Sequence, residues 1–195
     1  GVKKKRNSSI VVGLKYLKDN KIDFFFSPGN TGAVIYAASE IIGKTSHVEF
    51  PAIGTMMPNI HGDILLLDSG ASPMIDEDRG LELSLMGSIY FENILKHSFP
   101  PLGILNLGKE WYKGSKWVRK LDSILKKDRA FNYFGFVEGF DLFTSECRVF
   151  ITGGYTGNIL LKGIEGVYFY VRHLLKDKAQ DKAGARKLSE LLKQQ

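Results

Sequence analysis

The chain has 195 residues, 44% hydrophobic and 12% aromatic, which is enough apolar material for one sizeable core. The single cysteine, Cys147, excludes an intramolecular disulfide framework. The chain also shows no signal peptide and no apolar run approaching about 20 residues, so we expect a soluble cytoplasmic protein.

The net charge of +6 is concentrated at the two ends of the chain. Residues 1–21 hold seven basic residues and one acidic residue, and residues 172–195 hold seven and three. Because the middle is net acidic and has no basic groove with interleaved aromatics, a nucleic-acid partner is not expected. The pattern favours an acidic protein or an anionic membrane surface as partner, while solvated helix faces explain it equally well.

Short β-rich runs alternate with helix-length segments after an initial helix-like pattern. This alternation is typical of parallel α/β proteins. The expected strands are Asp23–Ser27, Asp63–Asp68, Leu102–Leu107, Phe131–Gly135 and Arg148–Thr152.

The C-terminal part has a different pattern from the rest. Apolar residues are denser over 158–176 than one buried helix face requires, and the chain stops in a polar helical stretch without a stop signal. We therefore expect a core over residues 1–163, a helical arm for dimer or membrane contact over 164–195, and a chain that is part of a longer one.

Four expected strands run into glycine-rich turns, which in a parallel sheet meet along one edge. Backbone N–H groups and helix dipoles at such turns bind anions, although glycine turns and caps use the same residues without any ligand. The turns are 27–33, 68–72, 106–108 and 152–158. Neither a P-loop nor a dinucleotide fingerprint occurs, and a nucleotide-binding α/β domain stays one alternative.

Nucleophiles and metal ligands are scattered along the chain. Its four histidines and Cys147 show neither metal-ligand spacing nor a nucleophile elbow, so neither covalent nor metal catalysis is expected. This inventory favours a reaction that works by positioning and electrostatics, in which the substrate brings its own nucleophile.

Taken in order, the motifs of this chain resemble the PlsX family of phosphate acyltransferases over nearly all 195 residues. The motifs are Ser8-Ser-Ile-Val-Val-Gly-Leu14, Ser27-Pro-Gly-Asn-Thr-Gly-Ala33, Leu67-Asp-Ser-Gly-Ala71, Leu85-Met-Gly-Ser88, Leu105-Asn-Leu-Gly108, Lys113-Gly114, Asn132-Tyr-Phe-Gly-Phe-Val-Glu-Gly139, Gly154-Tyr-Thr-Gly-Asn-Ile-Leu-Leu-Lys162 and Glu165-Gly166.

The resemblance implies a three-layer α/β/α sandwich related to isocitrate dehydrogenase and phosphotransacetylase, with a mostly parallel sheet. It also implies a homodimer that converts acyl–acyl carrier protein and inorganic phosphate to acyl phosphate, without metal or nucleotide. The acyl phosphate would pass to a membrane-bound acyltransferase in phospholipid synthesis, and the protein would contact the inner face of the cell membrane peripherally.

The resemblance also indicates the site residues. Lys113 is the expected catalytic cation, and Asn158 the expected hydrogen-bond donor to the same centre. An anion cradle is expected from Asn30 and Thr31 with the backbone of Gly29 and Gly32, and further substrate-binding positions are Asp68, Gly70, Glu138 and Gly157. For the asparagines and acidic residues, capping alone is the competing interpretation, and for Lys113 it is a surface lysine at a helix start.

Four positions depart from the family pattern on loops predicted to form the site. Gly153 stands where the family usually has Asp, Ser72 and Ser115 stand where it has Asn, and Phe50 stands where it has Arg. These changes leave open a catalytically impaired homologue or scaffold of the same fold.

Overall fold

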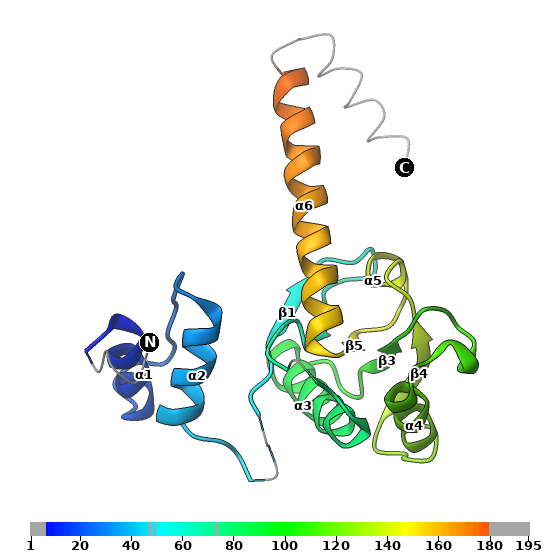
Figure 1. The fold of residues 1–195 in the computed structure, drawn as a ribbon, viewed down its shortest axis with the longest axis horizontal. Coiled ribbons are helices and arrows are strands. Elements are labelled where there is room, and N and C mark those ends of the chain that lie inside the picture. The colour runs from blue at the N-terminus through cyan, green and yellow to red at the C-terminus, as the bar shows by residue number, and fades with distance from the viewer. Residues whose placement is uncertain (1–6, 47, 49, 73, 180–195) are drawn as a thin grey trace. The chain divides into compact units, whose positions relative to one another are not determined.

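The computed structural model describes residues 7–46, 48, 50–72 and 74–179 (Figure 1). Two helices, α1 and α2, precede a sheet whose strands alternate with helices. In chain order the elements are α1 Ser9–Lys18, α2 Thr31–Ile41, β1 Gly54–Met57, β2 Ile64–Leu67, α3 Glu77–Leu95, β3 Pro101–Leu105, the 3-10 helix η1 Trp111–Lys113, α4 Lys116–Leu125, β4 Asn132–Val137, α5 Asp141–Thr144, β5 Val149–Ile151 and α6 Gly154–Ala179.

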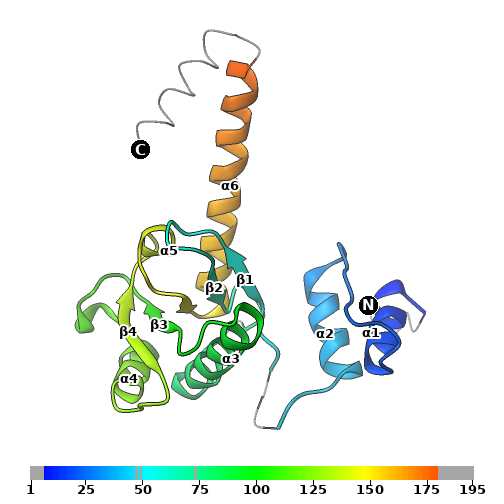
Figure 2. The same cartoon turned by 180° about the vertical axis from the view of Figure 1, so that it is seen from behind.

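The five strands form one sheet in the order β1-β2-β5-β3-β4. The strands β2, β5, β3 and β4 run parallel, and β1 pairs antiparallel with β2 at one edge (Figure 2). In the centre, Leu67 lies opposite Ile151, and Ile151 lies opposite Ile104. The predicted α/β class with a mostly parallel sheet flanked by helices is confirmed.

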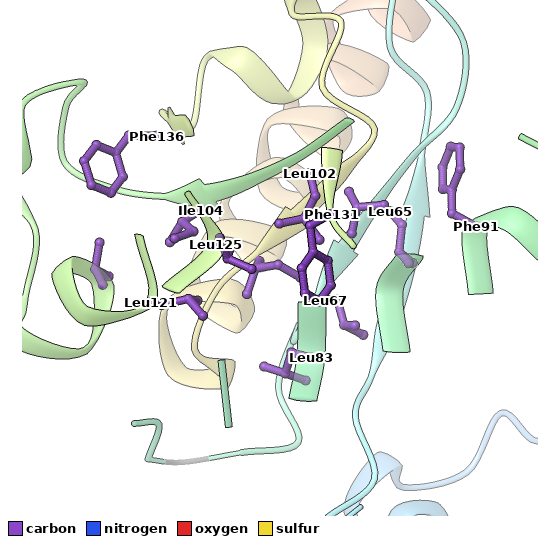
Figure 3. Close-up of a cluster of buried hydrophobic side chains, with 13 residues drawn as sticks. Leu65, Leu67, Leu83, Phe91, Leu102, Ile104, Leu121, Leu125, Phe131 and Phe136 are labelled. Carbon is purple, nitrogen blue, oxygen red and sulfur yellow. The ribbon is translucent and has the colours of Figure 1, made fainter. Parts of the chain in front are cut away.

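Burial explains why β2 and β5 occupy the middle of the sheet. All four residues of β2 and all three of β5 are buried, so both faces of these strands are covered, as in parallel sheets generally. On one face Leu65 and Leu67 belong to a cluster with Leu83 and Phe91 of α3 (Figure 3). Helix α4 joins the same cluster through Leu121 and Leu125, whose spacing of four places them on one helix face.

Local capping sets where the helices begin. Ser8 accepts a hydrogen bond from the Val11 N–H at the start of α1, and Asp76 accepts one from the Arg79 N–H at the start of α3. The first turn of α3 also contains Glu77 and Asp78, whose negative charges favour a helix N-terminus.

One predicted strand is wrong and one strand was missed. Residues 23–27 have no regular secondary structure and pair with none of the five strands that the structure describes. Phe25 instead lies against α1, where a Cβ at Gly13 would come within 2.1 Å of its ring, and Phe24 and Phe26 are 79% and 82% exposed. Strand β1 was missed because Gly54–Met57 lacks the β-branched run that marked the other strands.

The chain divides into two compact units, residues 1–157 and 158–195. The predicted C-terminal helix is present as α6, and residues 180–195 of the predicted arm lie outside the described residues. The sequence-based boundary between 163 and 164 stays a prediction. In the described part of the chain, no helix combines the length and the apolar character that crossing a membrane requires.

Candidate functional site

The candidate site is built from loops that follow parallel strands. Strands β2, β5, β3 and β4 all point the same way, so the residues after their last positions share one edge of the sheet. In open α/β sheets this edge is where ligands bind. The loops begin at Asp68, Thr152, Asn106 and Glu138.

Asp68 anchors the loop after β2. Its side chain is fully buried, and its two carboxylate oxygens accept four backbone hydrogen bonds. Oδ1 accepts from the N–H groups of Ile53 (3.2 Å), Gly70 (2.9 Å) and Ala71 (2.8 Å), and Oδ2 accepts from that of Ser72 (2.8 Å). A carboxylate is an acceptor only, and this one is already satisfied by the backbone. Asp68 therefore shapes the loop.

The start of α6 packs against this loop at backbone distance. A Cβ at Gly154 would lie 2.4 Å from the Ser72 carbonyl oxygen, and a Cβ at Gly157 would lie 2.0 Å from the Asp68 carbonyl oxygen. Real Cβ atoms do not approach backbone so closely, so only glycine fits at either position. Of the predicted substrate-binding residues, Asp68, Gly70 and Gly157 are thus brought together.

An ion pair connects the loop after β3 with the loop after β4. Lys109 forms an ion pair with Asp141, and Asp141 Oδ2 also accepts the Glu138 backbone N–H at 2.8 Å. Burial acts to raise the pKa of Asp141, but the hydrogen bonds from Lys109 and Glu138 outweigh it and hold the pKa below its usual value. Glu138 thus enters this network through its backbone.

Lys113 ends the short helix η1 in the loop after β3. Its side chain is 40% exposed, and its Nζ lies 2.9 Å from Glu110 Oε2. The hydrogen bond from Lys113 lowers the pKa of Glu110 below its usual value. The cation is accessible for an anionic ligand, with one carboxylate competing for it.

The remaining predicted residues lie elsewhere in the chain. Asn30 caps α2, since its Oδ1 accepts the Ala33 N–H at 3.0 Å, and Thr31, Gly29 and Gly32 are exposed beside it. The capping interpretation is therefore realised, and a cradle at this turn stays a prediction. Asn158 is exposed in α6 as the first residue of the second unit. A common centre for Asn30, Lys113 and Asn158 also stays a prediction.

Cys147 lies just before β5, at the opposite end of the parallel strands from these loops, with its thiol 3.5 Å from the Pro101 carbonyl oxygen. Burial raises the pKa of this thiol to about 12, which makes it a poor nucleophile. Among the described residues, no three His, Cys, Asp or Glu side chains lie where they could hold a metal ion together.

Sequence reasoning missed Arg79, Lys109 and Asp141. Arg79 stands on the acidic first turn of α3, and no motif marks it. The pairing of Lys109 with Asp141 spans 32 positions and becomes visible only when β3 and β4 are adjacent.

Comparison with known proteins gives one consistent result. Residues 1–195 match a family model described as "Fatty acid synthesis protein". A phosphate acyltransferase of Caldanaerobacter subterraneus subsp. tengcongensis is 37% identical over 176 residues, 90% of this chain and 53% of the relative. Those of Acetivibrio thermocellus and Dictyoglomus thermophilum are 38% and 36% identical, covering 90% and 98% of this chain and 51% and 57% of the relatives. The chain spans about half the length of the curated relatives it matches.

Proposed function

Because this chain belongs to the family of fatty acid synthesis proteins, we propose that it provides the acyl-transfer site of a phosphate acyltransferase. The substrates are an acyl–acyl carrier protein and inorganic phosphate. A phosphate oxygen attacks the thioester carbonyl carbon, the new C–O bond forms and the C–S bond breaks. The carrier leaves as a thiolate that takes up a proton, and the other product is the acyl phosphate.

The observation that carries this proposal is the rigid turn at the ends of β2 and β5. Four backbone N–H groups converge on the buried Asp68 carboxylate, and two glycines hold the start of α6 against the same turn. The first N–H groups of a helix have no partner within the helix and attract negative charge. The N–H groups at the start of α6, held in place by this turn, are therefore suited to stabilise a developing oxyanion without reorganising during the reaction.

The side chains are assigned roles on the same basis. Lys113 compensates the charge of phosphate or of the developing oxyanion, and Asn158 donates a hydrogen bond to the reacting centre. Asn30 and Thr31, with the backbone of Gly29 and Gly32, bind part of the substrate. Support for Lys113 is its partly exposed side chain, ion-paired with Glu110, in a loop at the sheet edge where ligands of α/β proteins bind.

Replacing Lys113 by methionine is expected to lower kcat for the phosphate-dependent release of carrier between about a hundredfold and a thousandfold. The measurement is the appearance of free carrier thiol from palmitoyl–acyl carrier protein with and without phosphate. Lys127→Met, at an exposed position beyond α4, is the matched control and should retain normal turnover. Equal turnover in both variants would remove Lys113 from the proposed site.

The proposed partners follow from charge and exposed apolar surface. The basic ends of the sequence complement acyl carrier protein and membrane lipids, both acidic in bacteria. Tyr168, Phe169 and Tyr170 on α6 are each more than 60% exposed, an apolar surface typical of contact sites. We propose a cytoplasmic homodimer with peripheral membrane contact that passes acyl phosphate to a membrane acyltransferase.

A catalytically impaired homologue is the second candidate, and Gly153 favours it. A Cβ at this position would lie 2.8 Å from Ile75 Cγ2, so the aspartate usual in the family fits here only if Ile75 moves. If the missing carboxylate limits turnover, Gly153→Asp combined with Ile75→Ala should raise kcat at least about tenfold, and Gly153→Asp alone should not. A double variant no faster than the unmodified protein would count against a role for this position.

A further inference from the structure

The loop after β3 contains a buried glycine, Gly108, whose backbone conformation does not require glycine. Its φ angle lies outside the left-handed region, so an alanine could adopt the same backbone without strain. Glycine at this position is therefore explained by the space beside its Cα, where the Cβ of any other residue would lie.

The side chains of one ion pair fill that space. A Cβ at Gly108 would lie 2.7 Å from Glu110 Oε2, 2.8 Å from Lys113 Cδ and 2.9 Å from Lys113 Nζ. The two charged groups lie 2.9 Å from each other. The ammonium group of Lys113 therefore lies directly against the Gly108 backbone, in a position that a side chain at residue 108 would occupy.

Asn106 fixes the backbone beneath this ion pair. Its side-chain Nδ2 donates a hydrogen bond to the Gly108 carbonyl oxygen at 2.9 Å, and its backbone N–H donates to the Val137 carbonyl oxygen at 2.8 Å. Val137 is the fully buried last residue of β4, which pairs with β3. The sheet thus sets the position of Gly108, and with it the position of the Lys113 ammonium group.

A catalytic lysine needs such restraint more than most residues do. Its side chain is a flexible four-carbon stem that loses rotamer freedom when it is fixed. A charge that stabilises a transition state acts best when it is in place before the reaction, and a misplacement of about 1 Å can lower a rate about a hundredfold. Glu110 and the open space at Gly108 hold the ammonium group of Lys113 from two sides.

We propose that Asn106 and Gly108 are positioning residues for acyl transfer, which hold the Lys113 ammonium group where it meets the phosphate or the developing oxyanion. The inference rests on the proposed function, which gives Lys113 that role. It also gives a function to the motif Leu105-Asn-Leu-Gly108, for which the sequence alone indicated no role.

Gly108→Ala tests the positioning without removing a charged group. The added methyl group meets the ends of two flexible side chains, so the urea midpoint should stay close to that of the unmodified protein. The Lys113 ammonium group has to move from 2.9 Å to an ordinary contact distance of 3.4–4 Å, and kcat for phosphate-dependent carrier release should fall about tenfold. Gly163→Ala, where nothing lies within 4 Å of the added Cβ, is the matched control and should retain normal kcat.

A double-mutant cycle separates positioning from a merely structural role. If Gly108 acts through Lys113, Gly108→Ala should lower kcat no further in a Lys113→Met background. Asn106→Ala removes the hydrogen bond to the Gly108 carbonyl oxygen, should behave in the same way, and decides the question if Gly108→Ala does not fold. Losses in kcat that simply add to the loss in Lys113→Met would overturn the assignment.

A second readout is independent of activity. The side-chain NMR signal of Lys113, identified by its loss in Lys113→Met, should shift in Gly108→Ala, while the signal of Lys127 beyond α4 stays where it is. An unchanged Lys113 signal would overturn the positioning role of Gly108. A shifted signal together with normal kcat would remove Lys113 from the proposed reaction and leave the positioning in place.

Discussion

Replacing Gly157 by alanine is expected to lower the free energy of unfolding of the sheet unit by about 3 kcal/mol, the upper end of the usual range for overpacking. The added methyl group would lie 2.0 Å from the Asp68 carbonyl oxygen and 2.9 Å from Thr152 Cγ2. The first of these is backbone held within the sheet pairing, because the Asp68 N–H donates to the Thr152 carbonyl oxygen at 3.1 Å. The strain cannot be relieved by a side-chain rotation, so the start of α6 has to move away from the turn.

The measurement is urea denaturation monitored by tryptophan fluorescence, because Trp111 and Trp117 both belong to the first unit. Gly163→Ala makes the same change in the same helix, where nothing lies within 4 Å of the added Cβ. Its stability should be unchanged or raised by up to about 1 kcal/mol, because alanine is the better helix former. Equal denaturation midpoints for the two variants would show that the close contact at Gly157 is absent.

Removing the Asp68 carboxylate is expected to cause the second large loss of folding stability. In Asp68→Ala the N–H groups of Ile53, Gly70, Ala71 and Ser72 lose their common acceptor, and a donor left unpaired where it is buried, as at Ser72, costs about 1–3 kcal/mol. Water and rearrangement will satisfy some of these groups, so we expect a total loss above about 3 kcal/mol. Asp68→Asn keeps one oxygen in place and should lose less.

Hydrogen exchange of the loop amides gives the most specific readout for Asp68. The amides of residues 70–72 should exchange faster in Asp68→Ala than in the unmodified protein, while amides in β3 and β4 change less. Asp128→Ala is the matched control, because its carboxylate accepts the Ala130 N–H at an exposed turn. If both variants lost similar stability, the buried network would not be what holds the loop.

Most of the sheet could be predicted because its central strands consist only of apolar residues. Ile64–Leu67 and Val149–Ile151 are apolar without interruption, and such runs occur where both faces of a strand are covered. Residues 23–27 have the same local propensity but were wrongly predicted as a strand. The β propensity of a segment does not show whether a neighbouring strand is available for hydrogen bonding. None of the described strands pairs with this segment.

The position of the candidate site on the sheet could be predicted from the sequence, but the contacts of its side chains could not. Glycine-rich turns after parallel strands predicted that Asp68, Gly70 and Gly157 lie at the carboxyl edge of the sheet, where the structure has them, and their role in binding stays a prediction. The capping interpretation anticipated that Asp68 binds the backbone of its own loop, but not that Ile53, 15 residues earlier, is one of its four donors. Arg79 was missed because its environment comes from the loops on either side of β1 and β2, which no helix motif reports.

We propose that this protein transfers an acyl group to inorganic phosphate, and phosphorus NMR of a reaction with palmitoyl–acyl carrier protein tests this activity most directly. We expect an acyl phosphate resonance that grows in step with free carrier thiol and requires added phosphate. Carrier released without a new phosphorus signal would mean hydrolysis by water, and together with phosphate-independent rates it would contradict the account.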